Sequence, residues 1–327
     1  MIGMDAWHDI DFPDPEDDSN VRYNPSEEEL RELAGAVEST TAYGSPSYVS
    51  EYRSRSADLT ANRRDEEFSA ADREDIAAAL EEASERELVA LDRKVGSDSD
   101  NTYTCRYFVP EEYARIAVSL SGLFEPADED AEPDFKTLQL PDWEGETKIR
   151  VDPEAGETYV LGSDYTGEAK KSFLRLFMYE AKQQGGLGLH AGTKRVRMEQ
   201  DGEMQEVGQL FMGLSGTGKS TLTSHGLWLD DPEYAEMVQD DVCALMPDGA
   251  VHGSEGGGLY IKTDSLTAEE QPELYEAATS EDAVLENVAV DDDGEVDFHD
   301  TELTRNGRAV VSRDDLPSAA DDINLDS

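Results

Sequence analysis

Apolar and polar residues follow a helical period in several segments of the first part of the chain. Residues 24–36 (NPSEEELRELAGA) place a serine N-cap ahead of acidic residues in the first turn, which predicts a helix start. A second helix is predicted over 69–87, and an amphipathic helix with a proline in its first turn over 110–124. Apolar runs at 102–109 and 135–143 predict strands.

From residue 156 on, short β-branched or aliphatic runs alternate with turns, and glycine becomes more frequent. This pattern predicts a mixed sheet with few long helices, and so an α/β domain that is not doubly wound in the ordinary dinucleotide-binding sense. The sequence has no internal repeat and no G-x-G-x-x-G fingerprint, so a nicotinamide cofactor has little support. The runs are ETYVLG, GGLGLHAG, RVRMEQDGEMQEVGQLFM, AEMVQDDVCALMPDGAVH, LYIKT, EVDFHD and RAVVS.

The length of 327 residues is enough for about two domains. Residues 1–24 are acidic, contain proline and have few aliphatic side chains, which predicts a mobile tail. We expect a substrate-side α/β domain over residues 25–187. A domain with the phosphate loop, binding nucleotide and metal, is expected over residues 188–327.

The charge of the chain limits the classes of partner that it can bind. It holds 76 Asp and Glu against 27 Lys and Arg, for a formal net charge of −49 and a pI near 4.1, and the acids are spread along its whole length. Such a field repels nucleic acid and anionic membranes, so we expect neither as a partner. The even spread favours a halophilic protein of a salt-rich cytoplasm, where ions screen the repulsion. An acidic protein that binds cationic partners is the other interpretation.

Cysteine use also indicates the cytoplasm. Cys105 and Cys243 are too few for a disulfide framework or a zinc cluster, which favours a reducing compartment. The sequence does not open with a charged and then apolar leader, and no run approaches about 18 apolar residues. Neither secretion nor membrane spanning is therefore expected.

The segment GLSGTGKSTL, residues 213–222, satisfies the pattern G-x-x-x-x-G-K-[ST]. In this loop backbone N–H groups wrap a polyphosphate, while Lys and Ser/Thr serve the terminal phosphates and the metal. The run EVGQLFM before it predicts a strand and KSTLTSH after it predicts a helix start, which is the context the loop requires. We expect nucleotide binding at Gly213, Leu214, Ser215, Gly216, Thr217, Gly218, Lys219, Ser220 and Thr221.

Lysine is scarce in this chain, which makes its positions informative. Of nine lysines, four fall in segments with the features of a site: Lys170, Lys171, Lys219 and Lys262. A chain that avoids surface lysine keeps such residues for chemistry. The alternative, that they merely offset local acid, is harder to hold for the adjacent pair in DYTGEAKKS.

Other candidate residues lie near predicted strands and helices. The run AEMVQDD places Asp240 and Asp241 at a strand end, where a hard divalent ion on nucleotide phosphates would find oxygen ligands. An exposed acidic turn is the alternative. Tyr165 lies just before a predicted helix, and His190 lies between small residues that leave its imidazole accessible. A lone histidine is more often structural.

Several separate motifs occur in the order, and near the spacing, of one known family: DYTGEAKKS, GLGLHAG, FMGLSGTGKSTL, VQDD, EGGGLYIKT, AVLENVAVDDDGEVDFHD and TRNGRAVVS. By these motifs the sequence resembles the ATP-dependent phosphoenolpyruvate carboxykinases over about residues 100–327, and only faintly before. The resemblance implies a two-domain α/β fold of the phosphoenolpyruvate carboxykinase type. It also implies conversion of oxaloacetate and ATP to phosphoenolpyruvate, ADP and carbon dioxide, a step of gluconeogenesis.

The resemblance implies a metal centre. Lys171, His190 and Asp241 match the family's ligands of a transition metal, usually Mn²⁺, that also meets the γ-phosphate. A lysine coordinates only as the neutral amine, so its pKa must be lowered by the cation and its neighbours. Ser220 matches the residue that holds the Mg²⁺ of the nucleotide.

The resemblance implies further catalytic residues. Lys219 would neutralise the β and γ phosphates, and Lys262 and Arg308 would stabilise charge on the transferring group. Glu286 would support the nucleotide site. Tyr165 resembles the tyrosine that lies against the substrate carboxylate or carbon dioxide.

The substrate carboxylate also needs an arginine, whose planar fork matches it. The segment SEYRSRSADLT offers Arg53 and Arg55, but its surroundings depart from the family's Gly-Arg-Ser-Pro pattern. The choice between the two stays open, and either is equally well a surface ion pair.

Some features depart from the family, and two other functions stay open. QDDVCALM keeps the acidic pair of the family motif but lacks its His and Trp. Family members continue beyond the point where this sequence stops, so we expect a C-terminally incomplete nucleotide domain. A phosphate-loop kinase of another substrate would explain the loop but leave Lys171 and His190 unused. A truncated remnant would bind nucleotide without catalysis. We expect a monomer.

Overall fold

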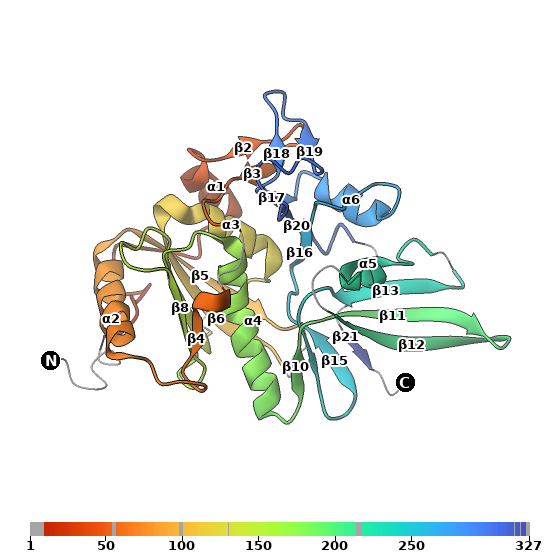
Figure 1. Cartoon of the computed structure of the whole chain (residues 1–327), viewed down its shortest axis with the longest axis horizontal. Coiled ribbons are helices and arrows are strands. Elements are labelled where there is room, and N and C mark those ends of the chain that lie inside the picture. The colour runs from red at the N-terminus through yellow and green to blue at the C-terminus, as the bar shows by residue number, and fades with distance from the viewer. Residues whose placement is uncertain are drawn as a thin grey trace.

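A computed structural model shows a mixed α/β protein with several mixed sheets, which confirms the predicted fold class (Figure 1). It describes residues 10–53, 57–97, 101–129, 131–213, 217–229, 231–316, 318–320 and 322–324. Its helices are α1 (Glu27–Ala34), η2 (Ala57–Leu59), α2 (Ala70–Glu85), η3 (Glu111–Tyr113), α3 (Ala114–Leu123), α4 (Thr166–Gln183), α5 (Lys219–Ser224) and α6 (Pro272–Ala278). None of the helices described is both long and apolar enough to cross a membrane.

The helices begin where their local sequences favour it. The Ser26 hydroxyl accepts from the backbone N–H of Glu29, whose carboxylate accepts from the N–H of Ser26, so α1 has a complete capping box. Ser69 and Asp72 form the same box at α2. The helix predicted over 110–124 is found as the short η3 followed by α3.

The largest sheet has seven strands in the order β1-β5-β6-β7-β9-β8-β4. Their bounds are β1 (Val21–Tyr23), β4 (Thr60–Asn62), β5 (Leu88–Val95), β6 (Tyr103–Pro110), β7 (Phe135–Leu140), β8 (Lys148–Asp152) and β9 (Glu157–Leu161). Side chains alternate between its faces. Leu88 and Ala90 join the core under α2, whereas Val89 and Leu91 join the core under α3 and α4. Helices therefore cover both faces of this sheet.

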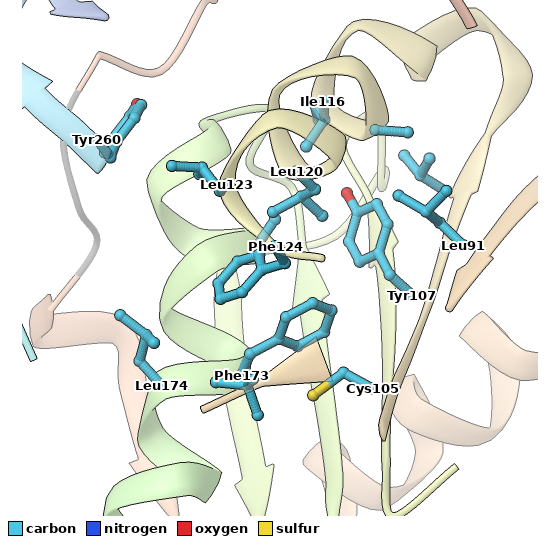
Figure 2. Close-up of a cluster of buried hydrophobic side chains, with 14 of the residues drawn as sticks. Leu91, Cys105, Tyr107, Ile116, Leu120, Leu123, Phe124, Phe173, Leu174 and Tyr260 are labelled. Carbon is cyan, nitrogen blue, oxygen red and sulfur yellow. The ribbon is translucent and has the colours of Figure 1, made fainter. Parts of the chain in front are cut away.

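Aromatic rings lock α3 and α4 onto the sheet (Figure 2). The Phe173 ring of α4 meets Phe124 with centroids 5.3 Å apart and Tyr107 with centroids 6.4 Å apart, both edge to face. All three side chains are fully buried. The Tyr107 hydroxyl donates to Oε1 of Gln139 at 2.8 Å, so its polar end is satisfied inside the core.

Residues 10–24 of the predicted mobile tail contact the seven-stranded sheet, residues 1–9 lie outside the described residues, and mobility of the segment stays a prediction. Strand β1 pairs in parallel with β5. The Phe12 ring packs against Phe108 and Tyr159, with centroids 5.7 and 5.5 Å away. These partners lie far along the chain, so the acidic local composition does not reveal them.

The remaining strands form smaller sheets with the orders β12-β11-β13, β10-β14-β15-β21, β16-β20-β17-β3-β2 and β18-β19. Their bounds are β2 (Ser39–Thr40), β3 (Pro46–Tyr48), β10 (Leu187–Leu189), β11 (Ala191–Gln200), β12 (Glu203–Met212), β13 (Tyr234–Gln239), β14 (Cys243–Leu245), β15 (Ala250–Gly253), β16 (Gly258–Lys262), β17 (Val284–Glu286), β18 (Ala289–Val290), β19 (Val296–Asp297), β20 (Arg308–Ser312) and β21 (Asp322–Asn324). The β11–β12 hairpin extends away from the body of the protein (Figure 1). Strand β3 pairs with β17, so one sheet contains strands from both sides of residue 187, where the boundary between the two domains is predicted. That boundary stays a prediction.

We expect Phe173→Ala to lower the free energy of unfolding by about 3–5 kcal/mol, because it removes a fully buried ring and leaves a cavity. Urea denaturation in concentrated KCl measures this. Val37→Ala is the control, since Val37 is 52% exposed and its truncation should change stability by no more than about 0.5 kcal/mol. A loss below about 1 kcal/mol at Phe173 would contradict the packing described.

Candidate functional site

A cavity of about 510 Å³ opens between α4, α5 and the strands β16 and β20, a size typical of small-molecule sites. Most of the predicted site residues line it: Tyr165, Lys171, His190, Gly213, Gly218, Lys219, Thr221, Asp241, Lys262 and Arg308. Segments far apart in sequence therefore supply one cavity.

The topology explains why His190 and Asp241 meet. His190 joins β10 to β11, and residues 240–242 join β13 to β14. Strand β10 pairs with β14, and β11 pairs with β13. Both segments thus pass from one sheet to the other at the same place, so His190 and residues 240–242 lie side by side. Helix α4 packs against β10 and β14 and brings its lysines to this point (Figure 1).

Three cationic or basic groups converge on the Asp241 carboxylate. Its Oδ2 lies 2.5 Å from Nζ of Lys171 and 3.0 Å from Nζ of Lys170. Its Oδ1 lies 2.8 Å from Nε2 of His190. The structure therefore brings together the amine, imidazole and carboxylate that the sequence singled out as one set.

The two adjacent lysines differ in their electrostatics. Burial alone would lower the pKa of Lys170, but the carboxylates of Asp241 and Glu255 outweigh it and raise that pKa. Burial lowers the pKa of Lys171, with Asp241 opposing the effect and Lys170 adding to it. Burial would raise the pKa of Asp241, but the two amines hold it well below its ordinary value. Lys171 therefore loses its proton more readily than Lys170 does.

The donor set fits a transition metal. In the described part of the chain, His, Cys, Asp and Glu alone form no group of three or more that could hold an ion. At Asp241, the His190 imidazole and the carboxylate supply two donors, and the adjacent Lys171 amine supplies a third when it is neutral. Mixed nitrogen and oxygen donors suit a transition ion. Oδ1 of the neighbouring Asp240 is buried without a hydrogen-bond partner among the described residues, so an acceptor is left at this wall of the cavity.

The phosphate loop is described at both of its ends. Gly213 leads into it from β12, and a Cβ at Gly213 would stand 2.3 Å from Oγ1 of Thr217. Gly218 precedes α5 with φ of 87°, a left-handed conformation that favours glycine. Nζ of Lys219 donates to the carbonyl of Asp240 at 2.5 Å. Leu214, Ser215, Gly216 and the side chain of Ser220 lie outside the described residues.

Three predicted residues share one register across neighbouring strands. Arg308 of β20 lies opposite Lys262 of β16 and opposite Glu286 of β17. Lys262 pairs with Asp264 at 2.6 Å and is half exposed. Arg308 and Lys262 line the cavity, whereas Glu286 does not. The Glu286 carboxylate is buried and accepts from Arg115, from the backbone of α4 and from the Tyr260 hydroxyl. This arrangement suits a supporting role rather than a direct nucleotide contact.

The Tyr165 end of the cavity carries the candidate substrate residues. A Cβ at Gly167 would lie 2.4 Å from the Tyr165 ring, so a glycine is needed there. The Asn306 amide donates to the Tyr165 hydroxyl at 3.1 Å and to the Arg53 carbonyl at 2.7 Å. The Arg53 guanidinium donates to backbone carbonyls and does not line the cavity. Arg55 lies outside the described residues, so the choice between the arginines stays open.

Sequence reasoning missed several residues that hold this site together. Glu255 is fully buried, lies 2.9 Å from Lys170 and accepts from Gln239 at 2.7 Å. The Tyr260 ring has the Lys170 amine and the Arg308 guanidinium each 5.2 Å from its centroid. Tyr260 also borders the core drawn in Figure 2. Glu255 and Tyr260 both occur in EGGGLYIKT, but nothing in that motif signals burial of its acid.

Asp241→Asn should lower the free energy of unfolding at neutral pH by about 3 kcal/mol, because it leaves buried amines without their counter-charge. Asp264→Asn is the matched control. Its partner Lys262 is half exposed, so the loss should stay below about 1 kcal/mol. Equal losses in the two variants would argue against a buried charge cluster.

The difference in unfolding free energy between wild type and Asp241→Asn should also depend on pH. The folded state holds the pKa of Asp241 well below 3.8, so its stabilisation is complete above that pH and disappears as the pH falls through the folded value. The unfolding free energies of wild type and Asp241→Asn should therefore converge on acidification. A difference independent of pH would contradict the lowered pKa.

Comparison with known proteins shows the family of this chain. The family PEPCK_ATP, phosphoenolpyruvate carboxykinase, matches residues 20–325. The phosphoenolpyruvate carboxykinase (ATP) of Aeropyrum pernix is 38% identical over 311 residues, covering 94% of this chain and 62% of that protein. The proteins of the same name from Brucella suis and Oceanobacillus iheyensis are 31% and 32% identical, over 74% and 67% of this chain and 44% and 41% of theirs. The chain thus spans about three-fifths or less of the length of these relatives. It belongs to the phosphoenolpyruvate carboxykinase family.

Proposed function

We propose that this chain catalyses the ATP-dependent conversion of oxaloacetate to phosphoenolpyruvate, ADP and carbon dioxide, as the names of its relatives suggest. The observation that carries the proposal is the convergence of Lys171 and His190 on Asp241, at the wall of a cavity that Lys219 also lines. A phosphate-loop kinase of another kind would need Lys219 and an acidic residue such as Asp241 but would leave Lys171 and His190 unused. The geometry therefore favours the carboxykinase.

We propose Lys171, His190 and Asp241 as the protein ligands of Mn²⁺. Burial favours the neutral form of the Lys171 amine, and His190 presents a half-exposed imidazole to the cavity. When bound, the ion supplies Lewis-acid stabilisation of negative charge on the reacting groups. Ser220, at the start of α5, is the proposed ligand of the Mg²⁺ that accompanies ATP.

The remaining residues act on the phosphates and the substrate. Lys219 neutralises the β and γ phosphates held by the loop from Gly213 to Thr221. Lys262 and Arg308 enter the cavity from paired strands, where they stabilise charge on the phosphoryl group in transfer. Tyr165 binds the substrate, together with Arg53 or Arg55. Glu286 holds its neighbours in place through its buried carboxylate.

We further propose a monomeric, halophilic protein of a salt-rich cytoplasm. A formal net charge of −49 is compatible with a compact fold when dissolved ions screen the repulsion between surface acids. The substrate-side and nucleotide-side domains are proposed to meet near residue 187 and to enclose the cavity between them.

His190→Ala should lower Mn²⁺-dependent phosphoenolpyruvate formation from oxaloacetate and ATP by at least about a hundredfold, because one of three proposed metal ligands is lost. A coupled assay in concentrated KCl with purified full chain measures it. His299→Ala is the control, since His299 is exposed and lies outside the cavity, and it should retain activity. Undiminished activity in His190→Ala would refute the metal assignment. ATP binding by the wild-type chain without turnover would favour a non-catalytic protein.

The halophilic proposal predicts that the urea midpoint of unfolding rises steadily between about 0.1 M and 2 M KCl, because screening lengths fall from about 10 Å to a few ångströms over this range. Urea is the denaturant because it adds no ions. A midpoint that does not change with KCl would count against adaptation to high salt.

A further inference from the structure

Lys194 is a buried lysine that the proposed chemistry does not use. It lies in the middle of β11 with only 5% of its surface exposed, in a chain with few lysines. Burial lowers its pKa, and no carboxylate among the described residues opposes that effect. A buried ammonium without a counter-ion is costly, so its other contacts must be strong or it must serve a function.

Among the described residues, the Lys194 amine contacts the end of one helix and an aromatic ring. Nζ of Lys194 donates to the carbonyl of Leu222 at 2.6 Å and to that of His225 at 2.7 Å. Leu222 lies in the last turn of α5, and His225 is its C-cap. The last carbonyls of a helix have no partners within the helix and favour a nearby cation. The Phe211 ring, with its centroid 5.2 Å from the amine, covers the remaining side.

Strand β11 is also shaped to receive this helix. A Cβ at Gly192 would stand 1.9 Å from Oγ1 of Thr223, so only a glycine permits the helix to approach so closely. Gly192 and Lys194 are two residues apart and so point to the same face of β11. Gly192 thus allows α5 to pack closely on β11, and Lys194 binds the C-terminal carbonyls of the helix.

The N-terminal part of α5 also borders the cavity. Lys219 and Thr221 line it, as does Ser224 at the other end of the helix, and Nζ of Lys219 donates to the Asp240 carbonyl. A helix of six residues has little stability of its own, so outside contacts must fix its position. Among the described residues, the hydrogen bonds from the Lys194 ammonium are the charge-assisted bonds at the C-terminal end of α5.

We propose that Lys194 is a positioning residue for the nucleotide: by binding the C-terminal carbonyls of α5 it fixes the place of Lys219 and Thr221 at the phosphates. This inference rests on the proposed nucleotide site, and Lys194 itself contacts neither nucleotide nor metal. Its loss should weaken nucleotide binding while leaving the oxaloacetate side of the cavity unaffected.

The test compares Lys194→Met and Lys194→Arg with wild type in the full chain. Isothermal titration with MgATP in concentrated KCl should show a Kd about tenfold higher for Lys194→Met, since small displacements of a phosphate-binding lysine are costly. Lys194→Arg keeps the charge and the donors and should recover most of the affinity. In the activity assay, KM for oxaloacetate should change by less than about twofold.

Lys136→Met is the matched control, because the Lys136 amine also lies near a ring, 5.6 Å from the Phe12 centroid, but belongs to β7 of the seven-stranded sheet rather than to the strand that receives α5. It should bind MgATP as wild type does. If Lys194→Met does not fold, Lys194→Gln takes its place, and circular dichroism checks each variant. Wild-type affinity in a folded neutral variant, or an arginine variant as weak as the neutral one, overturns the proposal. A wild-type chain that binds no MgATP overturns the nucleotide site as well, which separates the two failures.

Discussion

The candidate site depends on one interaction, the contact of the Asp241 carboxylate with two amines and an imidazole. The strands on either side of His190 and of residues 240–242 pair with each other in two different sheets, so the junctions cannot separate without breaking both pairings. Helix α4 then adds its lysines from a third direction. The Asp241 carboxylate, together with Glu255 beside Lys170, explains why the lysines can be buried, since without these acids they would be uncompensated charges.

This cluster also reverses the charge of the protein locally. The chain carries a formal net charge of −49, yet one cavity collects five cationic side chains: Lys170, Lys171, Lys219, Lys262 and Arg308. The acidic surface repels an anionic ligand at a distance, and the cationic side chains attract it only inside the cavity. Dissolved salt screens this long-range repulsion more than the short-range attraction. Glu255 and Asp241 balance the innermost cations, and the Tyr260 ring lies close to both Lys170 and Arg308. The site is therefore a compensated network rather than a simple basic patch.

Local signals in the sequence predicted much of this structure. A serine cap predicted α1, a helical pattern predicted α2, and strand patterns predicted β6, β7, β12 and β13. Motif order identified about half of the residues that line the cavity, among them Lys171, His190 and Asp241. Long-range packing was not predictable in this way: Phe12 lies in an acidic segment, and only its distant partners Phe108 and Tyr159 make it part of the core. The burial of Glu255 and the bonds of Lys194 likewise depend on which strands lie together, which no local pattern encodes.

The central claim is that Lys171, His190 and Asp241 hold one metal ion. Anomalous diffraction at the manganese edge, from crystals of the full chain grown with Mn²⁺ and ATP, tests it most directly. The account predicts a single strong peak within bonding distance of the Lys171 amine, the His190 imidazole and the Asp241 carboxylate. Manganese bound elsewhere, with the Lys171 ammonium still paired to Asp241, would contradict it.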